Sequence, residues 1–268
     1  MKILFLGDVV GNSGCEAVSK NLKNQIKLND IDFAIVNGEN ADEKGMGLTE
    51  EIMNNFFKCG VDVITTGNHV WDRKEILSHI ESETRLLRPQ NFIKPSPGRG
   101  FEIYESKNGF NVGVLNLMGN VFMKKSEDVF EAASKFIREN FLKKDYDFLV
   151  VDFHGEITSE KMAIGHFFDG KATLVIGTHT HIPTNDARVL QGGTAYQTDA
   201  GMCGDYDSVI GMNKKNSINR FLKKKSVQHF PATREATLCG VIVDCDVETG
   251  LAKNIESFIS GGELKDTH

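Results

Sequence analysis

Two histidines lie two residues apart at the end of an apolar segment, in the sequence Gly177-Thr178-His179-Thr180-His181. The preceding residues, Leu174 to Ile176, are apolar and are typical of a buried strand. In an extended or turning segment, side chains two positions apart leave the same side of the backbone, so both imidazoles can face one metal centre. An isolated pair of this kind is more often a pair of surface histidines. The metal hypothesis therefore depends on how the other strands end.

Four other apolar segments also end in residues that commonly bind metals, and each of these ends lies next to a glycine. With the histidine pair, the candidate residues are Asp8, Glu39, Asn40, Asn68, His69, His154, His179 and His181. In α/β proteins, sites form where the carboxyl ends of strands converge, so we expect these residues to be neighbours. Two carboxylates, two amides and four histidines exceed the needs of one ion. They suit a binuclear centre with ions about 3.5 to 4 Å apart and one bridging carboxylate.

The chemistry of the candidate ligands narrows the choice of metal. Imidazole, carboxylate and amide groups without any thiolate favour Mn, Fe or Zn in a catalytic site over a structural zinc. The ligand types do not choose among these three metals. The five cysteines are odd in number and lack Cys-x-x-Cys spacing, which predicts reduced thiols, most of them in the core.

The motifs at the strand ends resemble those of the calcineurin-like metallophosphoesterases, and specifically their YmdB-like branch. The matching motifs, in order along essentially the whole chain, are Gly7-Asp8, Gly38-Glu39-Asn40, Gly67-Asn68-His69, His154 and Gly177-Thr178-His179-Thr180-His181. Val10 replaces the histidine of the first superfamily motif, and Glu39 replaces the bridging aspartate of the second. These departures define the branch. They imply that Asn40 takes the place of the missing histidine, as a neutral ligand that leaves its ion more Lewis acidic.

The resemblance also implies a role for each candidate residue. One ion would be held by Asp8, Glu39, Asn40 and His181, and the other by Glu39, Asn68, His154 and His179. His69 would bind neither ion and would contact the scissile phosphate, where it stabilises charge or protonates the leaving oxygen. A hydroxide that bridges the two ions would attack phosphorus. We predict two Fe or Mn ions, with Zn as the alternative. Asn12 has two interpretations, a contact to the phosphate and a helix cap.

The implied activity is hydrolysis of small cyclic nucleotides of the 2′,3′-cAMP type by a phosphodiesterase. A phosphomonoesterase with the same metals is one alternative. A regulatory nucleotide-binding protein with incidental catalysis is another. The complete set of ligands and the additional His69 exceed what binding requires, which favours an enzyme. The other histidines, His79, His166, His229 and His268, do not follow a strand and receive no role.

Apolar and amphipathic patterns predict the elements that position these residues. Strands are expected at residues 3–6, 33–36, 61–66, 100–104, 111–117, 148–153, 173–176, 187–190, 193–198, 236–245 and 255–259. Helices are expected from Ser13, after a Thr49 cap, and over residues 72–79, 126–142, 159–168 and 213–225. The last strands would form an antiparallel remainder, while residues 118–125 and 199–217 would be loops, the first mobile and the second on the surface. The resemblance implies an α/β fold, a four-layer α/β/β/α sandwich of two mixed sheets.

Composition and charge limit the partners and the setting. A chain of 268 residues with 40% hydrophobic content predicts a single globular domain over residues 1–268. No apolar segment approaches the roughly 20 residues that span a bilayer, and Asp8 comes too early for a signal peptide. We therefore expect a cytoplasmic protein without a membrane partner.

The formal charge of −6 argues against a long nucleic acid as partner, because a polyanion needs a basic face. A small phosphodiester is compatible with this charge. We interpret the basic residues between Lys214 and Lys225 as the solvated face of a helix rather than a nucleic-acid site. A homo-oligomer is the default expectation.

Overall fold

The fold is built on two β-sheets, seen in a computed structural model that describes residues 1–224 and 228–267. The first sheet has the strand order β13-β12-β1-β3-β4. Its strands are β1 (Lys2–Leu6), β3 (Phe33–Asn37), β4 (Val63–Thr65), β12 (Leu238–Cys245) and β13 (Ala252–Ser260). The strands β1, β3 and β4 are parallel, and β12 pairs antiparallel with both β1 and β13. The parallel strands therefore end at one edge, where Asp8, Glu39 and Asn68 follow them.

The second sheet has the strand order β5-β6-β7-β8-β10-β9. Its strands are β5 (Phe101–Glu105), β6 (Asn111–Met118), β7 (Phe148–His154), β8 (Leu174–Thr178), β9 (Arg188–Val189) and β10 (Ala195–Gln197). The four central strands are parallel, and the two edge strands are antiparallel to their neighbours. A third pair joins β2 (Asp8–Val9) to β11 (Met202–Cys203) in parallel. Both main sheets are mixed, as predicted.

Alternation along β1 shows how the layers form. Ile3 and Phe5 pack into the core between the two sheets, and Leu4 and Leu6 pack on the opposite face beneath helices. All four side chains are almost fully buried. Successive strand residues point to opposite faces, so a continuous apolar run is expected when both faces are covered.

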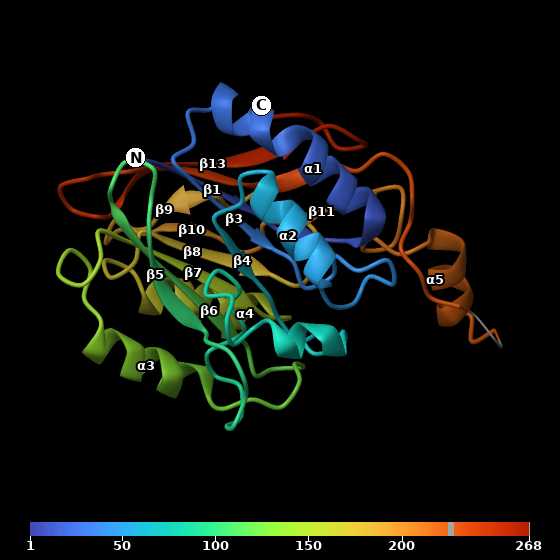
Figure 1. Ribbon diagram of the computed structural model, residues 1–268, viewed down its shortest axis with the longest axis horizontal. Coiled ribbons are helices and arrows are strands. Elements are labelled where there is room, and N and C mark those ends of the chain that lie inside the picture. The colour runs from blue at the N-terminus through green and yellow to red at the C-terminus, as the bar shows by residue number, and fades with distance from the viewer. Residues whose placement is uncertain (225–227, 268) are drawn as a thin grey trace.

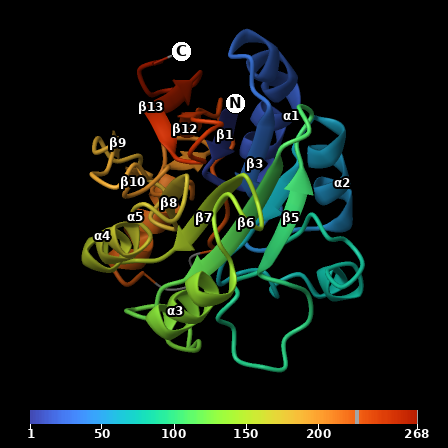
Figure 2. The same cartoon turned by 90° about the vertical axis from the view of Figure 1, so that its left-hand side faces the viewer.

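Helices cover the outer face of each sheet (Figures 1 and 2). The helices α1 (Gly11–Leu28) and α2 (Glu50–Lys58) lie over the first sheet, and α3 (Val129–Glu139) and α4 (Thr158–Phe167) lie over the second. The remaining helical segments are the 3-10 helix η1 (Lys74–Ser78) and α5 (Lys214–Phe221). Figure 1 shows α5 at the edge of the molecule, beyond the ends of the strands. The predicted four-layer α/β/β/α sandwich is confirmed.

The predicted N-terminal cap is confirmed for α2 but not for α1. Thr49 caps α2, because its hydroxyl accepts a hydrogen bond from the backbone N–H of Ile52. The other prediction was wrong: α1 begins at Gly11, and neither Asn12 nor Ser13 is its cap. Val10 occupies the cap position without a side-chain hydrogen bond. The chain enters α1 directly from the strand pair β2 and β11, a pairing that local sequence does not reveal.

Three other predictions need correction. The chain after His181 is not wholly antiparallel, because β10 runs parallel to β8. Residues 199–217 are not simply a surface loop, since β11 is buried within them. The helix expected over residues 72–79 is the short 3-10 segment η1. A two-residue strand such as β11 is too short to show a period in the sequence. Two residues named in the predictions lie outside the described residues: Lys225, the expected end of the last helix, and His268.

Within the described residues, no helix has both the length and the apolar character to cross a bilayer. The five cysteines are free thiols, and Cys203, Cys239 and Cys245 are buried. Burial raises the pKa of Cys239 and Cys245 to about 12, so these thiols stay protonated and act as core residues.

Candidate metal centre

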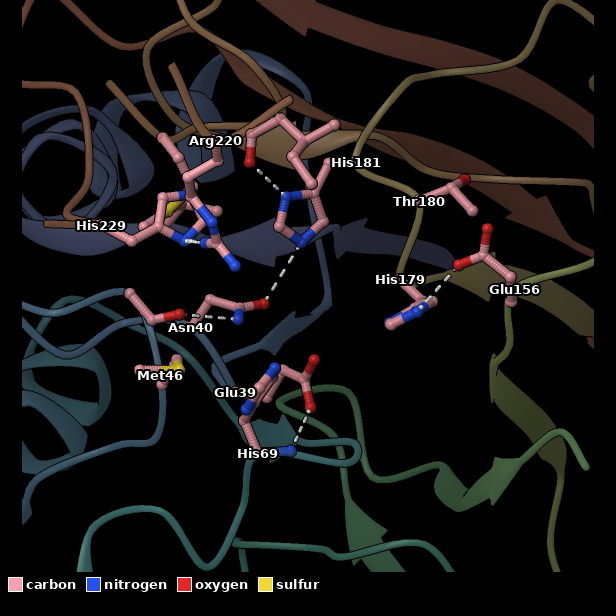
Figure 3. Close-up of a pocket in the computed structure, with 14 residues that line it drawn as sticks. Glu39, Asn40, Met46, His69, Glu156, His179, Thr180, His181, Arg220 and His229 are labelled. Carbon is pink, nitrogen blue, oxygen red and sulfur yellow. Dashed lines mark hydrogen bonds and ion pairs between the residues drawn. The ribbon is translucent and has the colours of Figure 1, made fainter. Parts of the chain in front are cut away.

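The strand ends of both sheets meet at one cavity of about 480 Å³. The candidate residues that line it are Glu39, Asn40, His69, His179 and His181 (Figure 3). Asp8 and His154 lie beneath them with fully buried side chains, and Asn68 is 8% exposed. The structure therefore brings all eight strand-end candidates together, although Asp8 and His179 are 171 residues apart in the sequence.

His154 lies at the centre of the closest group of metal-binding atoms. Its Nε2 atom is 2.9 Å from Glu39 Oε1, 3.1 Å from Asn68 Oδ1 and 3.1 Å from His179 Nδ1. Glu39, His154 and His179 can direct one ligand atom each to a common point. With Asn68, these three residues make up the set that the resemblance implies for the second ion.

Two buried carboxylate oxygens support the fit of this site to a cation. Asp8 Oδ1 and Glu39 Oε1 are inaccessible to solvent and accept no hydrogen bond. Glu39 Oε1 lies 2.9 Å from His154 Nε2, so the two atoms are close without hydrogen-bond geometry. A buried polar atom without a partner is costly and needs an explanation. A bound ion would satisfy both oxygens.

Electrostatics at the centre also favour a cation. Burial raises the pKa of Asp8 above its usual value. Burial acts the same way on Glu39, but the His154 imidazole outweighs it and lowers the Glu39 pKa. For His154, burial opposes charge, yet the carboxylates of Glu39 and Asp8 outweigh it and raise the pKa. The proton on His154 thus balances the buried carboxylates. A metal would replace it, because imidazole binds metals as a neutral base.

His179 and His181 face different partners. His179 Nδ1 faces His154, whereas His181 Nε2 lies 3.3 Å from Asn40 Oδ1. Both residues lie beyond the end of β8 with positive φ angles, 97° for His179 and 67° for His181. Non-glycine residues adopt such angles rarely and at a cost in free energy. The turn, rather than strand alternation, therefore directs the two imidazoles.

In His154, His179 and His181, the ring nitrogen that points away from the other candidate ligands, here called the outer nitrogen, lies close to an oxygen atom of a neighbouring residue. His154 Nδ1 is 2.9 Å from Thr178 Oγ1, and His181 Nδ1 is 2.8 Å from the carbonyl of Ile210. His179 Nε2 is 3.1 Å from Glu156 Oε2. A hydrogen bond from the outer N–H fixes the tautomer and leaves the other nitrogen free to bind a metal. His154 and His181 would bind through Nε2, and His179 through Nδ1.

Asp152 connects four strands beneath the centre. Its Oδ1 accepts a hydrogen bond from Thr178 at 2.7 Å, which orients the hydroxyl that His154 contacts. Its Oδ2 accepts from Asn37 Nδ2 at 2.9 Å and Thr65 Oγ1 at 2.5 Å. Burial raises the pKa of Asp152 to about 6. These contacts fix the ends of β3, β4, β7 and β8 relative to one another.

His69 forms a pair with an acidic residue that sequence reasoning did not select. Its Nδ1 atom lies 2.7 Å from Asp72 Oδ2, three residues along the chain. The backbone N–H of His69 donates to Glu39 Oε2 at 3.0 Å, which holds the residue at the edge of the cavity. Asp72 would keep the proton on Nδ1 and leave Nε2 for a substrate.

Gly67 shows why a glycine precedes Asn68. A Cβ atom at this position would lie 2.3 Å from the ring of His154 and 2.4 Å from Glu39 Oε2. Any side chain would displace these two residues. The glycine therefore permits the close approach of backbone to ligands that the strand-end pattern predicted.

A buried ion pair holds the turn between the two histidines. Asp199 Oδ2 lies 2.6 Å from Lys161 Nζ and also accepts hydrogen bonds from the hydroxyl and the backbone N–H of Thr180, at 2.6 and 3.2 Å. The side chains of Lys161 and Asp199 are 1% and 0% exposed. Thr180 lies between His179 and His181, so the pair stabilises their unusual backbone conformation.

Lys161→Met should lower the free energy of unfolding by about 3 to 5 kcal/mol, because it leaves the Asp199 carboxylate buried without its cation. Urea unfolding followed by circular dichroism measures the change in the free energy of unfolding. The control is Lys20→Met, which removes a surface ion pair with Glu16 and should cost at most about 1 kcal/mol. Equal losses in the two variants would contradict the assigned role of the buried pair.

Asn12 does not join the site. It is exposed at the start of α1 and lines two other surface depressions rather than the metal-site cavity. Sequence reasoning also missed residues around the site. Asp72 and Glu156 contact His69 and His179. Asp152 bonds to Thr178 beneath the centre, and Arg220 and His229 line the cavity. Spacing gave a signal for two of them, since Asp152 and Glu156 lie two residues on either side of His154. Arg220 and His229 reach the cavity through tertiary structure alone.

Known proteins resemble this chain over nearly its full length. A family model described as YmdB-like protein matches residues 4–258. The chain is 44% identical over 262 residues to the 2′,3′-cyclic-nucleotide 2′-phosphodiesterase of Bacillus subtilis strain 168, and the match covers 97% of each chain.

Two solved structures are also similar. One is a hypothetical protein from Thermus thermophilus, with a TM-score of 0.89, 37% identity and coverage of 97% of this chain and 99% of the other. The second is a novel phosphatase from Mycoplasma pneumoniae, with a TM-score of 0.89, 34% identity and coverage of 97% and 93%. The family model, which matches residues 4–258, extends across all the strand ends that form the cavity.

Proposed function

This chain belongs to the YmdB-like protein family, as its strand-end motifs predicted, and we propose that it is a binuclear metal-dependent phosphodiesterase that hydrolyses 2′,3′-cyclic nucleotides. The observation that carries the proposal is the group of metal-binding atoms around His154 Nε2, in a chain whose similarity to a named phosphodiesterase is full-length. A cavity that combines such a group with an additional histidine suits catalysis.

We infer two ligand sets, as the resemblance implies, and the contacts around His154 support the first of them. Glu39, Asn68, His154 and His179 would hold one ion. Asp8, Glu39, Asn40 and His181 would hold the other, with Glu39 common to both. The two buried carboxylate oxygens without partners support this assignment. We infer Fe or Mn as the resident metal, with Zn as the alternative. When bound, the ions supply Lewis acidity, which activates water and withdraws charge from the phosphoryl oxygens.

His69 would complete the reaction as a general acid. Water oxygen forms a new bond to phosphorus, the bond from phosphorus to O2′ breaks, and O2′ takes a proton from His69 Nε2. The product is a 3′-phosphomonoester. Asp72, 2.7 Å from Nδ1, stabilises the imidazolium before the transfer and keeps the ring oriented. The proton released by the attacking water restores His69 for the next turnover.

The test is an assay of the purified protein with 2′,3′-cAMP, 3′,5′-cAMP and the monoester p-nitrophenyl phosphate, together with metal analysis. We expect about two equivalents of Fe or Mn per chain and turnover of 2′,3′-cAMP in preference to the other two. Chelation should abolish the activity and added Mn should restore it.

Other outcomes would favour the alternatives. A clear preference for the monoester would indicate a phosphomonoesterase, and the similar Mycoplasma pneumoniae structure is described as a phosphatase. Nucleotide binding without turnover in the metal-loaded protein would indicate a regulatory binding protein. Absence of metal after purification and after reconstitution would contradict the whole assignment.

A further inference from the structure

A second cavity adjoins the one that contains the candidate metal centre. It has a volume of about 400 Å³ and is lined by Val209, Ile210, Ser217, Arg220, Phe221 and His229. Ile210, Arg220 and His229 line both cavities, so these three side chains form the wall between them. Figure 3 shows Arg220 and His229 together on one side of the metal-site cavity, opposite His179 and Glu156. A ligand that extends from the metal-site cavity into the second cavity would therefore pass the side chains of Arg220 and His229.

The wall between the two cavities presents hydrogen-bond donors without a negative partner. Arg220 is the only lysine or arginine among the described residues that line either cavity. Its guanidinium contacts His229 Nδ1, and within residues 1–224 and 228–267 no carboxylate pairs with it. Burial, together with Arg220, lowers the pKa of His229, so this imidazole is neutral and accepts at Nδ1. The remaining guanidinium N–H groups and His229 Nε2–H are free to bind an anion.

The helical segment that carries Arg220 has further features that suit a nucleic acid strand. Lys215, Lys223 and Lys224 are exposed, and no described carboxylate forms an ion pair with them. Phe221, in the wall of the second cavity, is 83% exposed. Basic side chains beside an exposed aromatic ring are the combination by which proteins hold single strands, with phosphates on the cations and a base stacked on the ring. Sequence alone indicated only a solvated helix face here.

A cyclic mononucleotide would leave these groups unused. Its single anionic group is the cyclic phosphate, which the metal ions would take. Arg220 and His229 would then face an uncharged nucleoside. A second phosphate would be present if another nucleotide preceded the cyclic one, because a phosphodiester links the two. The protein presents the metal centre first, then the donors Arg220 and His229, and then the cavity with Phe221. The strand presents its groups in the same order: the cyclic phosphate, the linking phosphate and the preceding base.

We propose that the substrate is a short RNA strand ending in a 2′,3′-cyclic phosphate, with its last two nucleotides bound in the two cavities. The terminal nucleotide lies over the metal centre, the linking phosphate binds Arg220 and His229, and the preceding base stacks on Phe221. The terminus is ribonucleotide, because a 2′,3′-cyclic phosphate requires O2′. This inference rests on the proposed function, and the bond that breaks is the same. The rest of the surface, with its net negative charge, has no place in this binding.

Kinetics test the proposal with two substrates, 2′,3′-cAMP and the dinucleotide adenylyl-(3′→5′)-adenosine 2′,3′-cyclic phosphate. We expect the dinucleotide to have a kcat/KM about tenfold or more higher in the wild-type protein, as expected for one phosphate contact and one stacked base. Arg220→Gln and Phe221→Ser should each lower this ratio. Lys23→Gln, which removes an exposed lysine of α1 remote from both cavities, should leave the ratio at its wild-type value.

Binding separates failure of this inference from failure of the proposed function. Calorimetry compares 3′-AMP with the dinucleotide that carries a 3′-phosphate, neither of which contains a cyclic ester. The dinucleotide should bind about tenfold tighter, and Arg220→Gln should make its slope of log affinity against log salt shallower by about 0.7.

Equal affinities of the two ligands, or a wild-type kinetic ratio near one with normal turnover of 2′,3′-cAMP, would overturn the second subsite and leave the proposed function intact. Tighter dinucleotide binding without turnover of either substrate would support the subsite and overturn the proposed function. If Phe221→Ser changes the mass in light scattering without altering dinucleotide affinity, the apolar face of α5 contacts a second copy, and the subsite is overturned.

Discussion

Glu39→Gln should remove both metal ions and lower kcat/KM for 2′,3′-cAMP by about 10³-fold or more. Glu39 Oε1 lies 2.9 Å from His154 Nε2, and its side chain is 1% exposed. The carboxylate is the one ligand assigned to both ions, and the amide keeps its size but loses its charge. Metal ions contribute several kcal/mol to stabilisation of the transition state, and each 1.36 kcal/mol corresponds to a factor of ten. Plasma emission spectrometry and steady-state kinetics on the same sample measure the two effects.

The matched control for this variant is Glu43→Gln, four residues along the same loop. The Glu43 side chain is 67% exposed and does not line the metal-site cavity. This variant should keep both the metal content and the rate of the wild-type protein. Full metal content in Glu39→Gln would show that Glu39 is not a shared ligand.

His69→Ala should retain both ions and lower kcat by about 10² to 10⁴-fold, the range for loss of a general acid. The side chain of His69 is 25% exposed and pairs with Asp72 rather than with the central group of ligand atoms. Asp72→Asn keeps a hydrogen-bond partner for Nδ1 but removes the charge that stabilises the imidazolium. We therefore expect a smaller loss of rate from it, with metal content unchanged.

The control for the His69 variant is His79→Ala, which removes a histidine that follows η1, pairs with Glu50 and does not line the cavity. Its rate should equal that of the wild-type protein. Loss of an ion in His69→Ala would make His69 a ligand instead of an acid. An unchanged rate with both ions bound would remove it from the mechanism. Comparison with Glu39→Gln also distinguishes an enzyme from a regulatory protein, since only an enzyme depends on His69 while its metals stay bound.

Two of the buried acidic residues outside the ligand set, Asp152 and Asp199, explain how the centre keeps its shape. Asp152 joins the four strands that carry most of the ligands, and Asp199 with Lys161 holds the turn between His179 and His181. Both are fully buried and fully engaged in hydrogen bonds or ion pairs. Such supporting contacts position metal ligands and their loss commonly weakens metal binding.

The sequence by itself determined the fold class and which residues gather at the site. Each candidate, from Asp8 to His181, follows a local apolar run and has a glycine nearby in the sequence. In a parallel sheet, the carboxyl ends of strands share one edge, so knowledge of the strand ends is enough to predict that their residues meet.

Tertiary structure decided what surrounds those residues and what they can reach. Strand alternation suggested that His179 and His181 would face one centre, and both line its cavity. Their positive φ angles, which alternation does not predict, direct them toward His154 and Asn40 respectively. Arg220 lines the cavity although its segment indicated only a solvated helix, and His229 lines it although its sequence context indicated no role. Contacts between residues more than a hundred positions apart leave no periodic pattern in a single sequence. The Gly-Thr-His-Thr-His segment therefore predicts a metal centre only together with the other strand ends, whereas the orientation of its imidazoles depends on Asp199, Lys161 and the packing of two sheets.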